Sequence, residues 1–144
     1  MKKLTREELE EMGKAIPWGK TFDENGYLLT SQDGDWHMKT YDDNHNLLTH
    51  INSFGYQVEY TYDDNNNLLT HEDSNGYGWK HTYDENSNHL TLKDIDGFWF
   101  KKTYDNNGNK LTFKDNEDGY SIRGETVSEE EFDEFNEFKK ENNG

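Results

Sequence analysis

A repeat of 21 residues constrains the fold of this chain more than any other feature. The tripeptide Thr-Tyr-Asp starts at Thr40, Thr61, Thr82 and Thr103, and a first copy, Thr21-Phe22-Asp23, lies two residues closer to its neighbour. Seven positions after each aromatic residue stands a leucine, followed in every copy by threonine: Leu29, Leu48, Leu69, Leu90 and Leu111. Fixed periods of this length indicate stacked supersecondary units, none of which can bury its apolar face alone.

Each repeat predicts a β-hairpin. Between Tyr56 and Tyr62, apolar and polar residues alternate, which is typical of a half-buried strand. Runs rich in Asp, Asn and Ser, such as residues 42–46 and 72–75, supply turn residues. Because the connections are short, we expect an all-β fold: an antiparallel meander of about five tandem 21-residue hairpins with about ten strands. The pattern leaves open whether the sheet is open, curled or closed, and which face is exposed.

Both ends of the chain predict helices. Thr5 and Glu8 form a capping box and Pro17 ends the helix, while Ser128 and Glu131 repeat the box near the C-terminus. Terminal units of repeat proteins need such closing elements. We therefore expect a capping helix in residues 1–20, hairpin repeats in residues 21–124 and an acidic helix in residues 125–144.

The repeated motif resembles the YD repeat of Rhs-type and teneurin-type proteins. It consists of Tyr-Asp, an Asn/Asp/Glu-rich turn, leucine, and Asp-x-x-Gly about fourteen residues on, and it covers about residues 21–124. In those large proteins many hairpins enclose a cargo, which five hairpins cannot do. The chain is also similar to short acidic repeat proteins often carried by bacteriophages, and the resemblance implies a hairpin scaffold. Gly26 and Gly108 match the turn glycine of the motif, and we expect three asparagines to replace it elsewhere: Asn46, Asn67 and Asn88.

Charge and composition exclude several classes of function and favour others. The chain has 31 acidic and 15 basic residues, a formal charge of −16, which disfavours direct binding to nucleic acids or anionic membranes and predicts a basic partner. It has no cysteine, so disulfides and thiol nucleophiles are excluded. No apolar run is long enough to span a membrane, and the first residues lack the apolar stretch of a signal peptide. We expect a soluble protein of the cytoplasm, the host's cytoplasm if a phage encodes it.

No motif predicts catalysis, a metal site or a cofactor. The turns begin Asp-x-Asn-x-Asn like calcium loops, but the twelfth place holds Ser53, Ser74, Ile95 or Asn116 where a calcium loop has glutamate. The six histidines include His50 and His71 at equivalent repeat positions, yet no CxxC or HExxH accompanies them. Turn geometry and a polar sheet face explain these residues more simply, so we predict a protein that is not an enzyme.

The acidic pairs that open successive turns should line one edge of the sheet, roughly 10 Å apart, and the last helix adds a second negative surface. The leading hypothesis is a DNA-mimicking inhibitor, of the anti-CRISPR or anti-restriction type, that blocks the nucleic-acid-binding surface of a host defence protein. The predicted contact residues are Asp42, Asp43, Asp63, Asp64, Asp84, Glu85, Glu130, Glu134 and Glu137.

Two alternatives use aromatic residues. A carbohydrate- or ligand-binding module would stack its ligand on Trp36, Trp79 and Trp99. We expect Trp36 and Trp99 to lie either beneath the terminal helices or exposed to a partner. A self-associating scaffold would instead dock a stripe on the last helix against another copy, and that stripe consists of Phe132, Phe135 and Phe138.

Overall fold

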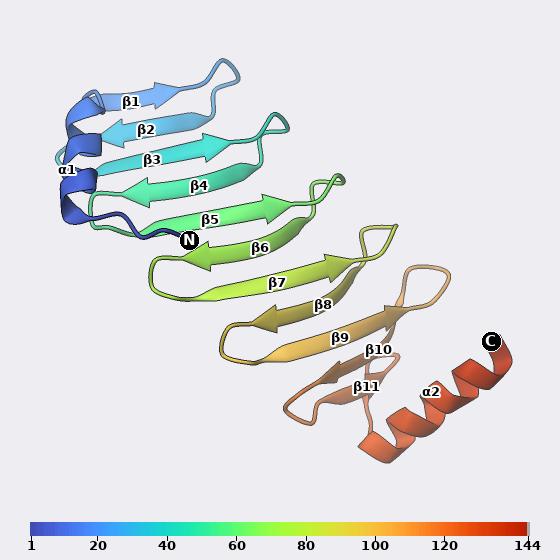
Figure 1. Ribbon diagram of the computed structural model, residues 1–144. Coiled ribbons are helices and arrows are strands. Elements are labelled where there is room, and N and C mark those ends of the chain that lie inside the picture. Colours follow the sequence, from blue (N-terminus) through green and yellow to red (C-terminus); the bar gives the residue numbers. More distant parts are fainter. Residues whose placement is uncertain (144) are drawn as a thin grey trace. The chain divides into compact units, whose positions relative to one another are not determined.

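The computed structural model describes residues 1–143, and the chain divides into two compact units, residues 1–79 and residues 80 onward. Within the described residues, twelve strands follow one another in sequence order, and each resolved pairing is antiparallel (Figure 1). The predicted all-β meander with a helix at each end is therefore confirmed. We describe each unit by itself.

The first unit begins with helix α1 and holds three complete hairpins. Its elements are α1 (Arg6–Ala15), β1 (Gly19–Phe22), β2 (Leu28–Gln32), β3 (Trp36–Tyr41), β4 (Leu47–Asn52), β5 (Gln57–Tyr62) and β6 (Leu68–Asp73), followed by the start of β7 (Gly78–Tyr83). The second unit continues with β8 (His89–Asp94), β9 (Trp99–Tyr104), β10 (Lys110–Asp115), β11 (Tyr120–Ile122), β12 (Glu125–Thr126) and α2 (Glu129–Asn143).

The Tyr-Asp turns share one five-residue geometry. In the turn that starts at Asp63, the Asp63 N–H donates to the Asn67 carbonyl, and the Asn66 N–H donates to the Asp63 carbonyl, both at 3.0 Å. The Asp63 carboxylate accepts the N–H groups of Asn65 and Asn67, each at 2.9 Å. This side chain therefore satisfies turn amides that neither strand can reach, which explains why aspartate starts each turn.

The left-handed residue of these turns differs from our prediction. Positive φ occurs at His45, Asn66 and Ser87, with values of 62°, 65° and 64°, and at Gly26 and Gly108. The predicted asparagines lie one position later in the turn, where their side chains bind the turn aspartate. The Asn67 side-chain amide, for example, donates to Asp63 Oδ2 at 3.0 Å. The prediction was wrong because it compared the fourth residue of one turn with the fifth residue of another.

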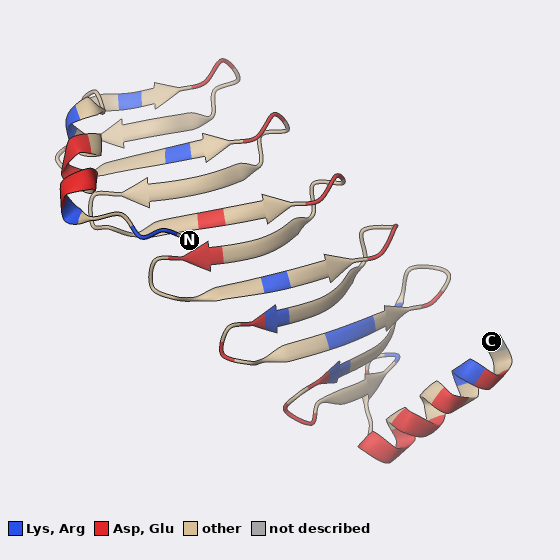
Figure 2. Cartoon of the chain, viewed as in Figure 1, with Lys and Arg blue, Asp and Glu red and all other residues tan. Residues whose placement is uncertain are grey.

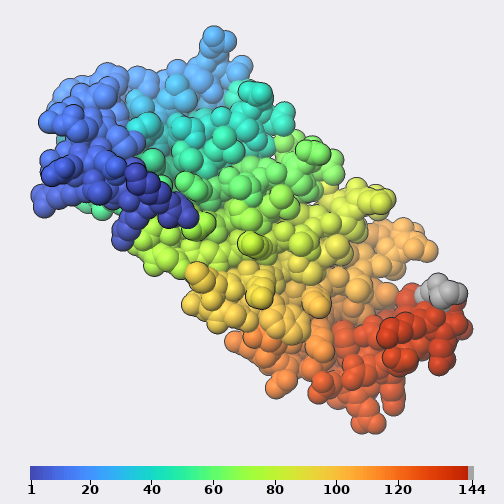
Figure 3. Space-filling model, viewed as in Figure 1, coloured from blue at the N-terminus to red at the C-terminus, as the bar shows by residue number. Residues whose placement is uncertain are grey.

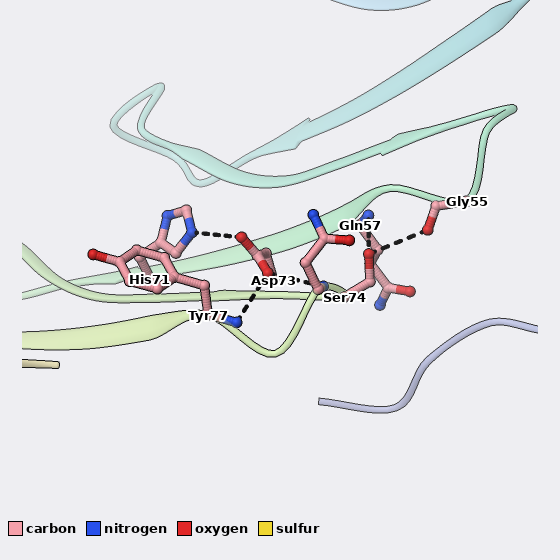
Figure 4. A network of polar contacts seen from close by, with 7 residues as sticks. Gly55, Gln57, His71, Asp73, Ser74 and Tyr77 are labelled. Carbon is pink, nitrogen blue, oxygen red and sulfur yellow. Dashed lines mark hydrogen bonds and ion pairs between the residues drawn. The ribbon is translucent and has the colours of Figure 1, made fainter. Parts of the chain in front are cut away.

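The opposite ends of the hairpins use the same turn. In residues 73–77, the Asp73 carboxylate accepts the N–H groups of Asn75 and Tyr77, and Gly76 takes the left-handed position with φ 83°. Ser74 Oγ accepts the Gln57 N–H at 3.0 Å and donates to the Gly55 carbonyl at 3.2 Å (Figure 4). These bonds tie the turn to β5 and to the preceding turn, and so extend the pairing beyond the strand ends.

Tyrosine hydroxyls join successive hairpins. In the first unit the Tyr41 hydroxyl donates to the Leu28 carbonyl and the Tyr62 hydroxyl to the Leu47 carbonyl, both at 2.9 Å. Phe22 occupies the equivalent position in β1, which ends the strand order and has no preceding hairpin to accept such a bond. The first repeat therefore has phenylalanine at this position, where a tyrosine hydroxyl would have no preceding hairpin to bind.

Helix α1 closes one face of the first unit. Trp36 is only 5% exposed and lies against Gly13, where a Cβ atom would collide with the indole. The Gln32 amide donates to the Gly13 carbonyl, and the Gln57 amide donates to the Lys2 carbonyl, each at 3.2 Å. The N-terminal segment is therefore held by both packing and hydrogen bonds, and Trp36 lies beneath the terminal helix, one of its two predicted positions.

Half-buried aromatic and imidazole rings pack against one another in the second unit. His81 and His89 stack with their centroids 4.3 Å apart, and Phe100 lies 5.6 Å from Phe113. Burial, with smaller contributions from His89 and Lys102, lowers the pKa of His81 to about 4, so His81 is neutral at pH 7. The aliphatic content is low, and aromatic and imidazole rings take the place of a larger aliphatic core.

We predict that Tyr62→Phe destabilises the protein by about 1 kcal/mol, because the Leu47 carbonyl loses its side-chain donor. The control is Phe22→Tyr, which adds a hydroxyl where no preceding hairpin can accept it and should leave stability nearly unchanged. Urea unfolding of both variants measures the difference. A Tyr62→Phe protein as stable as the parent chain would contradict the proposed role of the hydroxyl.

We predict that Asp63→Ala lowers the melting temperature by several degrees, whereas Asp64→Ala, at an exposed neighbouring position, changes it little. Hydrogen bonds from the Asn67 side chain and backbone lower the pKa of Asp63. Its stabilising contribution is therefore complete above its ordinary pKa and disappears as the pH falls through the lowered value. Thermal unfolding at neutral and acid pH tests this, and equal effects of the two substitutions would refute it.

Candidate functional site

The two acids that open each turn have different roles. Asp42, Asp63 and Asp84 accept hydrogen bonds from their own turns, and hydrogen bonds from Asn88 lower the pKa of Asp84 as those from Asn67 do for Asp63. The second acids are exposed: Asp43, Asp64 and Glu85. The first acid therefore contributes charge while its oxygens accept hydrogen bonds from the turn, and the second acid is exposed beside it.

The acids of the Tyr-Asp turns in the first unit lie along one edge of its sheet. Figure 2 shows acidic residues at the same end of its successive hairpins. Side chains connect neighbouring turns, since the Asn46 amide donates to Asn66 Oδ1 at 2.8 Å and Asn25 Nδ2 lies 2.7 Å from His45 Nε2. The structure thus brings Asp42, Asp43, Asp63 and Asp64 together along one edge, as the repeat predicts.

Two turns of the second unit enclose a polar groove of about 660 Å³. Its lining includes Asp84 and Asp105 with amide side chains such as Asn86, Asn88 and Asn107. Hydrogen bonds within the turns lower the pKa of both carboxyl groups, so both are ionised at neutral pH. The groove is negative and rich in hydrogen-bonding groups.

Helix α2 carries the other predicted acids. Its inner side holds Phe132, 6% exposed and 5.3 Å from the Tyr120 ring, and Phe135, which faces the Arg123 guanidinium. Phe138 is 60% exposed. Residues three apart in a helix differ in direction by about 300°, which is about 60° short of a full turn. Each successive phenylalanine of the stripe therefore points further away from the first contact. The stripe therefore docks the helix on its own unit, and its last member points outward.

The outer side of α2 is acidic. Glu130, Glu134 and Glu137 are exposed on the same helix as Phe138. Figure 2 shows acidic residues along α2, and Figure 3 shows the surface of this helix. Glu137 pairs with Lys140 at 3.4 Å, and both side chains remain exposed. The surface thus combines several carboxylates with one exposed aromatic ring. The sequence pattern did not predict the exposure of Phe138, although the drift of an every-third-residue stripe could have indicated it.

The three tryptophans predicted as ligand contacts, among the four in the chain, do not form one ligand-binding face. Trp36 is buried beneath α1 and cannot contact a ligand, which corrects its prediction as a contact residue. Trp79 is half-buried and stacks on His71 with a centroid distance of 5.4 Å. Trp99 is a half-buried residue of the second unit, and the Lys101 ammonium group lies 5.7 Å from the centre of its ring.

Histidines occupy defined places on the strands. His37 in β3 and His50 in β4 stack, with His37 Nδ1 3.1 Å from His50 Nε2. His71 Nε2 lies 3.3 Å from the carboxylate of Asp73, which is 9% exposed (Figure 4). Burial opposes ionisation of Asp73, but hydrogen bonds from Tyr77 and His71 outweigh it and lower the pKa of the carboxyl group. The contact between His37 and His50 follows from strand register and was not predicted from repeat positions.

Among residues 1–143, no three His, Asp or Glu side chains are grouped so that they could hold a metal ion. The Asp-x-Asn-x-Asn pattern is explained by the hydrogen bonds of the turns, which occupy the first aspartate. Neither α1 nor α2, as far as the structure describes them, has the length and apolar character needed to cross a membrane.

Comparison with known proteins supports the interpretation of the repeat. No curated protein matches the chain. Among solved structures, part of the chain in "Crystal Structure of TcdB2-TccC3-TEV" is similar, with 14% identity and a TM-score of 0.38 over 67% of this chain and 7% of that one. This chain thus corresponds to a small fraction of that protein. The family model described as RHS Repeat matches residues 41–77, which include the hairpin of β5 and β6. Residues 41–77 therefore match the RHS repeat, in agreement with the resemblance of their Tyr-Asp motifs to YD repeats.

Proposed function

We propose that this chain is a non-catalytic repeat module that binds a basic protein surface through the outer side of α2. The observation that supports this best is the exposure of Phe138, at 60%, on a helix side that also exposes Glu134, Glu137 and Glu141. Interfaces commonly combine an aromatic anchor with a charged surround that sets orientation and association rate. A partner surface with Lys or Arg around an apolar pocket would complement this arrangement.

The exposed turn acids extend the negative potential of each unit. In the first unit these are Asp43 and Asp64, and in the second Glu85 follows the ionised Asp84. Long-range attraction between such a surface and a basic partner accelerates association without requiring direct contact by every acid. Asp42, Asp63 and Asp84 would act in this way, because their oxygens already accept bonds from their turns.

The partner that fits best is a protein with a nucleic-acid-binding surface, because such surfaces gather Lys and Arg to contact phosphates. Occupation of that surface by an acidic module would exclude the nucleic acid. An inhibitor of a host defence protein, of the anti-CRISPR or anti-restriction type, would act in this way, in the cytoplasm where its target lies. The proposal includes no catalytic step, metal or cofactor.

The alternatives receive less support from the described residues. A ligand stacked on the three tryptophans would need Trp36, which is buried. A second copy of the chain docked on Phe138 would bring the same acidic helix against itself, and like charges at close range oppose that contact. A basic partner avoids both difficulties.

We predict that the triple substitution Glu130→Gln, Glu134→Gln and Glu137→Gln weakens binding to a captured basic partner by about tenfold or more, equivalent to about 1.4 kcal/mol. The partner is first isolated from a bacterial lysate at low salt, released by salt and purified, and its affinity for each variant is then titrated. Affinity for the unaltered chain should fall as ionic strength rises.

The matched control removes three exposed acids from the other helix: Glu7→Gln, Glu10→Gln and Glu11→Gln. It changes net charge and helix composition equally and should retain most of the affinity. An equal loss in both triple variants would show that overall charge rather than α2 determines binding. Affinity that does not depend on salt would contradict the proposed function itself.

We predict that Phe138→Ala reduces affinity for the same partner by about 1–2 kcal/mol while leaving the unfolding transition unchanged, because the ring is exposed in the free protein. The comparison is Phe132→Ala, which should destabilise the fold because that ring packs on Tyr120. Binding of Phe138→Ala at full affinity would remove Phe138 from the interface.

A further inference from the structure

His37 and His50 place two ring nitrogens side by side on the first unit. His37 Nδ1 lies 3.1 Å from His50 Nε2, and the rings stack with centroids 5.3 Å apart and an interplanar angle of 29°. In the register of β3 and β4, Lys39 faces His50 and Asn52 faces His37. The two histidines are therefore diagonal neighbours on one face of a rigid hairpin, and their backbones are fixed by the ladder.

The separation of the two nitrogens suits a shared metal ion. Imidazole nitrogens bind Zn²⁺ at about 2.0–2.1 Å, and two nitrogens on one tetrahedral or octahedral ion then lie about 2.8–3.4 Å apart. The observed 3.1 Å is within this range, so the rings need only reorient about their side-chain bonds. Without metal, one ring donates its N–H to the other, and a change of tautomer frees both facing nitrogens.

We propose that His37 and His50 form a two-histidine site for a divalent transition-metal ion such as Zn²⁺, Ni²⁺ or Cu²⁺, with water in the remaining positions. Imidazole is a preferred ligand for these ions. In residues 1–143, no third ligand of the His, Asp or Glu type completes the group. The site is therefore open and of modest affinity, and it differs from the three-ligand catalytic zinc sites that the sequence argues against.

Some groups around His37 and His50 favour metal binding, and others oppose it. The two ring nitrogens face each other at 3.1 Å, which favours a shared ion, and metal binding requires both rings in their neutral form. The Lys39 ammonium group, however, repels a cation placed between the rings. The Tyr56 ring lies edge-on to His50 at 6.4 Å and contributes no charge at this pH. The surplus of acidic residues in the chain favours cation binding in general.

The other histidines offer internal comparisons. His89 stacks on His81 at 4.3 Å, but its Nε2 lies 3.0 Å from the Thr91 carbonyl, while His81 Nδ1 lies 3.5 Å from the Tyr83 hydroxyl. His81 Nδ1 and His89 Nε2 thus have partners outside the pair, whereas His37 Nδ1 and His50 Nε2 face each other. His81 therefore serves as a matched control in the second unit, because it has a similar environment and a stacked histidine neighbour.

Titration of the complete, untagged chain with Zn²⁺ at pH 7.5, followed by calorimetry and by NMR of the histidine rings, tests the proposal. In excess Ca²⁺, we expect one zinc site whose binding perturbs the His37 and His50 rings. His37→Gln or His50→Gln should weaken Zn²⁺ binding by about tenfold or more, and His81→Gln should leave it unchanged. Retained affinity in His37→Gln, an equal loss in His81→Gln, or displacement of Zn²⁺ by Ca²⁺ would overturn the assignment.

Lys39→Met provides a variant with the opposite expected effect. Removal of the ammonium group should strengthen Zn²⁺ binding several-fold while His37 and His50 remain in place. Far-UV circular dichroism of each variant verifies the fold before titration. Lower affinity in a folded Lys39→Met protein would contradict the proposed location of the ion, since no ligand has been removed.

Discussion

The hydrogen bonds between the first residue of each turn and the turn's own amides are the constraint on which the rest of the structure depends. Asp63 satisfies the N–H groups of Asn65 and Asn67, and Asp73 does the same for Asn75 and Tyr77 at the other end of the strands. Because the same turn occurs at both ends, each strand has a fixed length and register. Cross-strand pairs such as Thr61 and Thr70, whose hydroxyls lie 2.6 Å apart, can then recur in every hairpin.

This constraint separates two kinds of acid that look alike in the sequence. Asp63 folds the turn, whereas Asp64 beside it is exposed and can change without loss of a turn hydrogen bond. A negative edge thus arises as a consequence of the repeat, since every additional hairpin brings another turn aspartate. In α2, Glu131 caps the helix with Ser128, whereas Glu130, Glu134 and Glu137 lie outside that capping box and belong to no turn. These three exposed acids are therefore the ones that we assign to partner binding.

The sequence predicted the features that depend on local spacing and missed those that depend on register or packing. The period placed the hairpins, and the capping boxes at Thr5 and Ser128 placed both helices, because these signals lie within a few residues. The left-handed residue His45 was missed because an asparagine stands next to it in the expected pattern. The contact between His37 and His50 crosses two strands and becomes visible only once Lys39 is known to face His50.

The amino acid at a repeat position differs between copies where the structural elements that surround that position differ. Phe22 replaces tyrosine where no preceding hairpin can accept a hydroxyl, and Trp36 occupies the position of Gln57 where α1 covers the sheet. His37 similarly takes the repeat position of Val58, which is 1% exposed, and brings a metal-binding nitrogen to a site where the next repeat has a methyl group. A repeat whose geometry is maintained by its turns can vary its strand residues in this way, so a chain of such hairpins can differ in what it binds while retaining one fold.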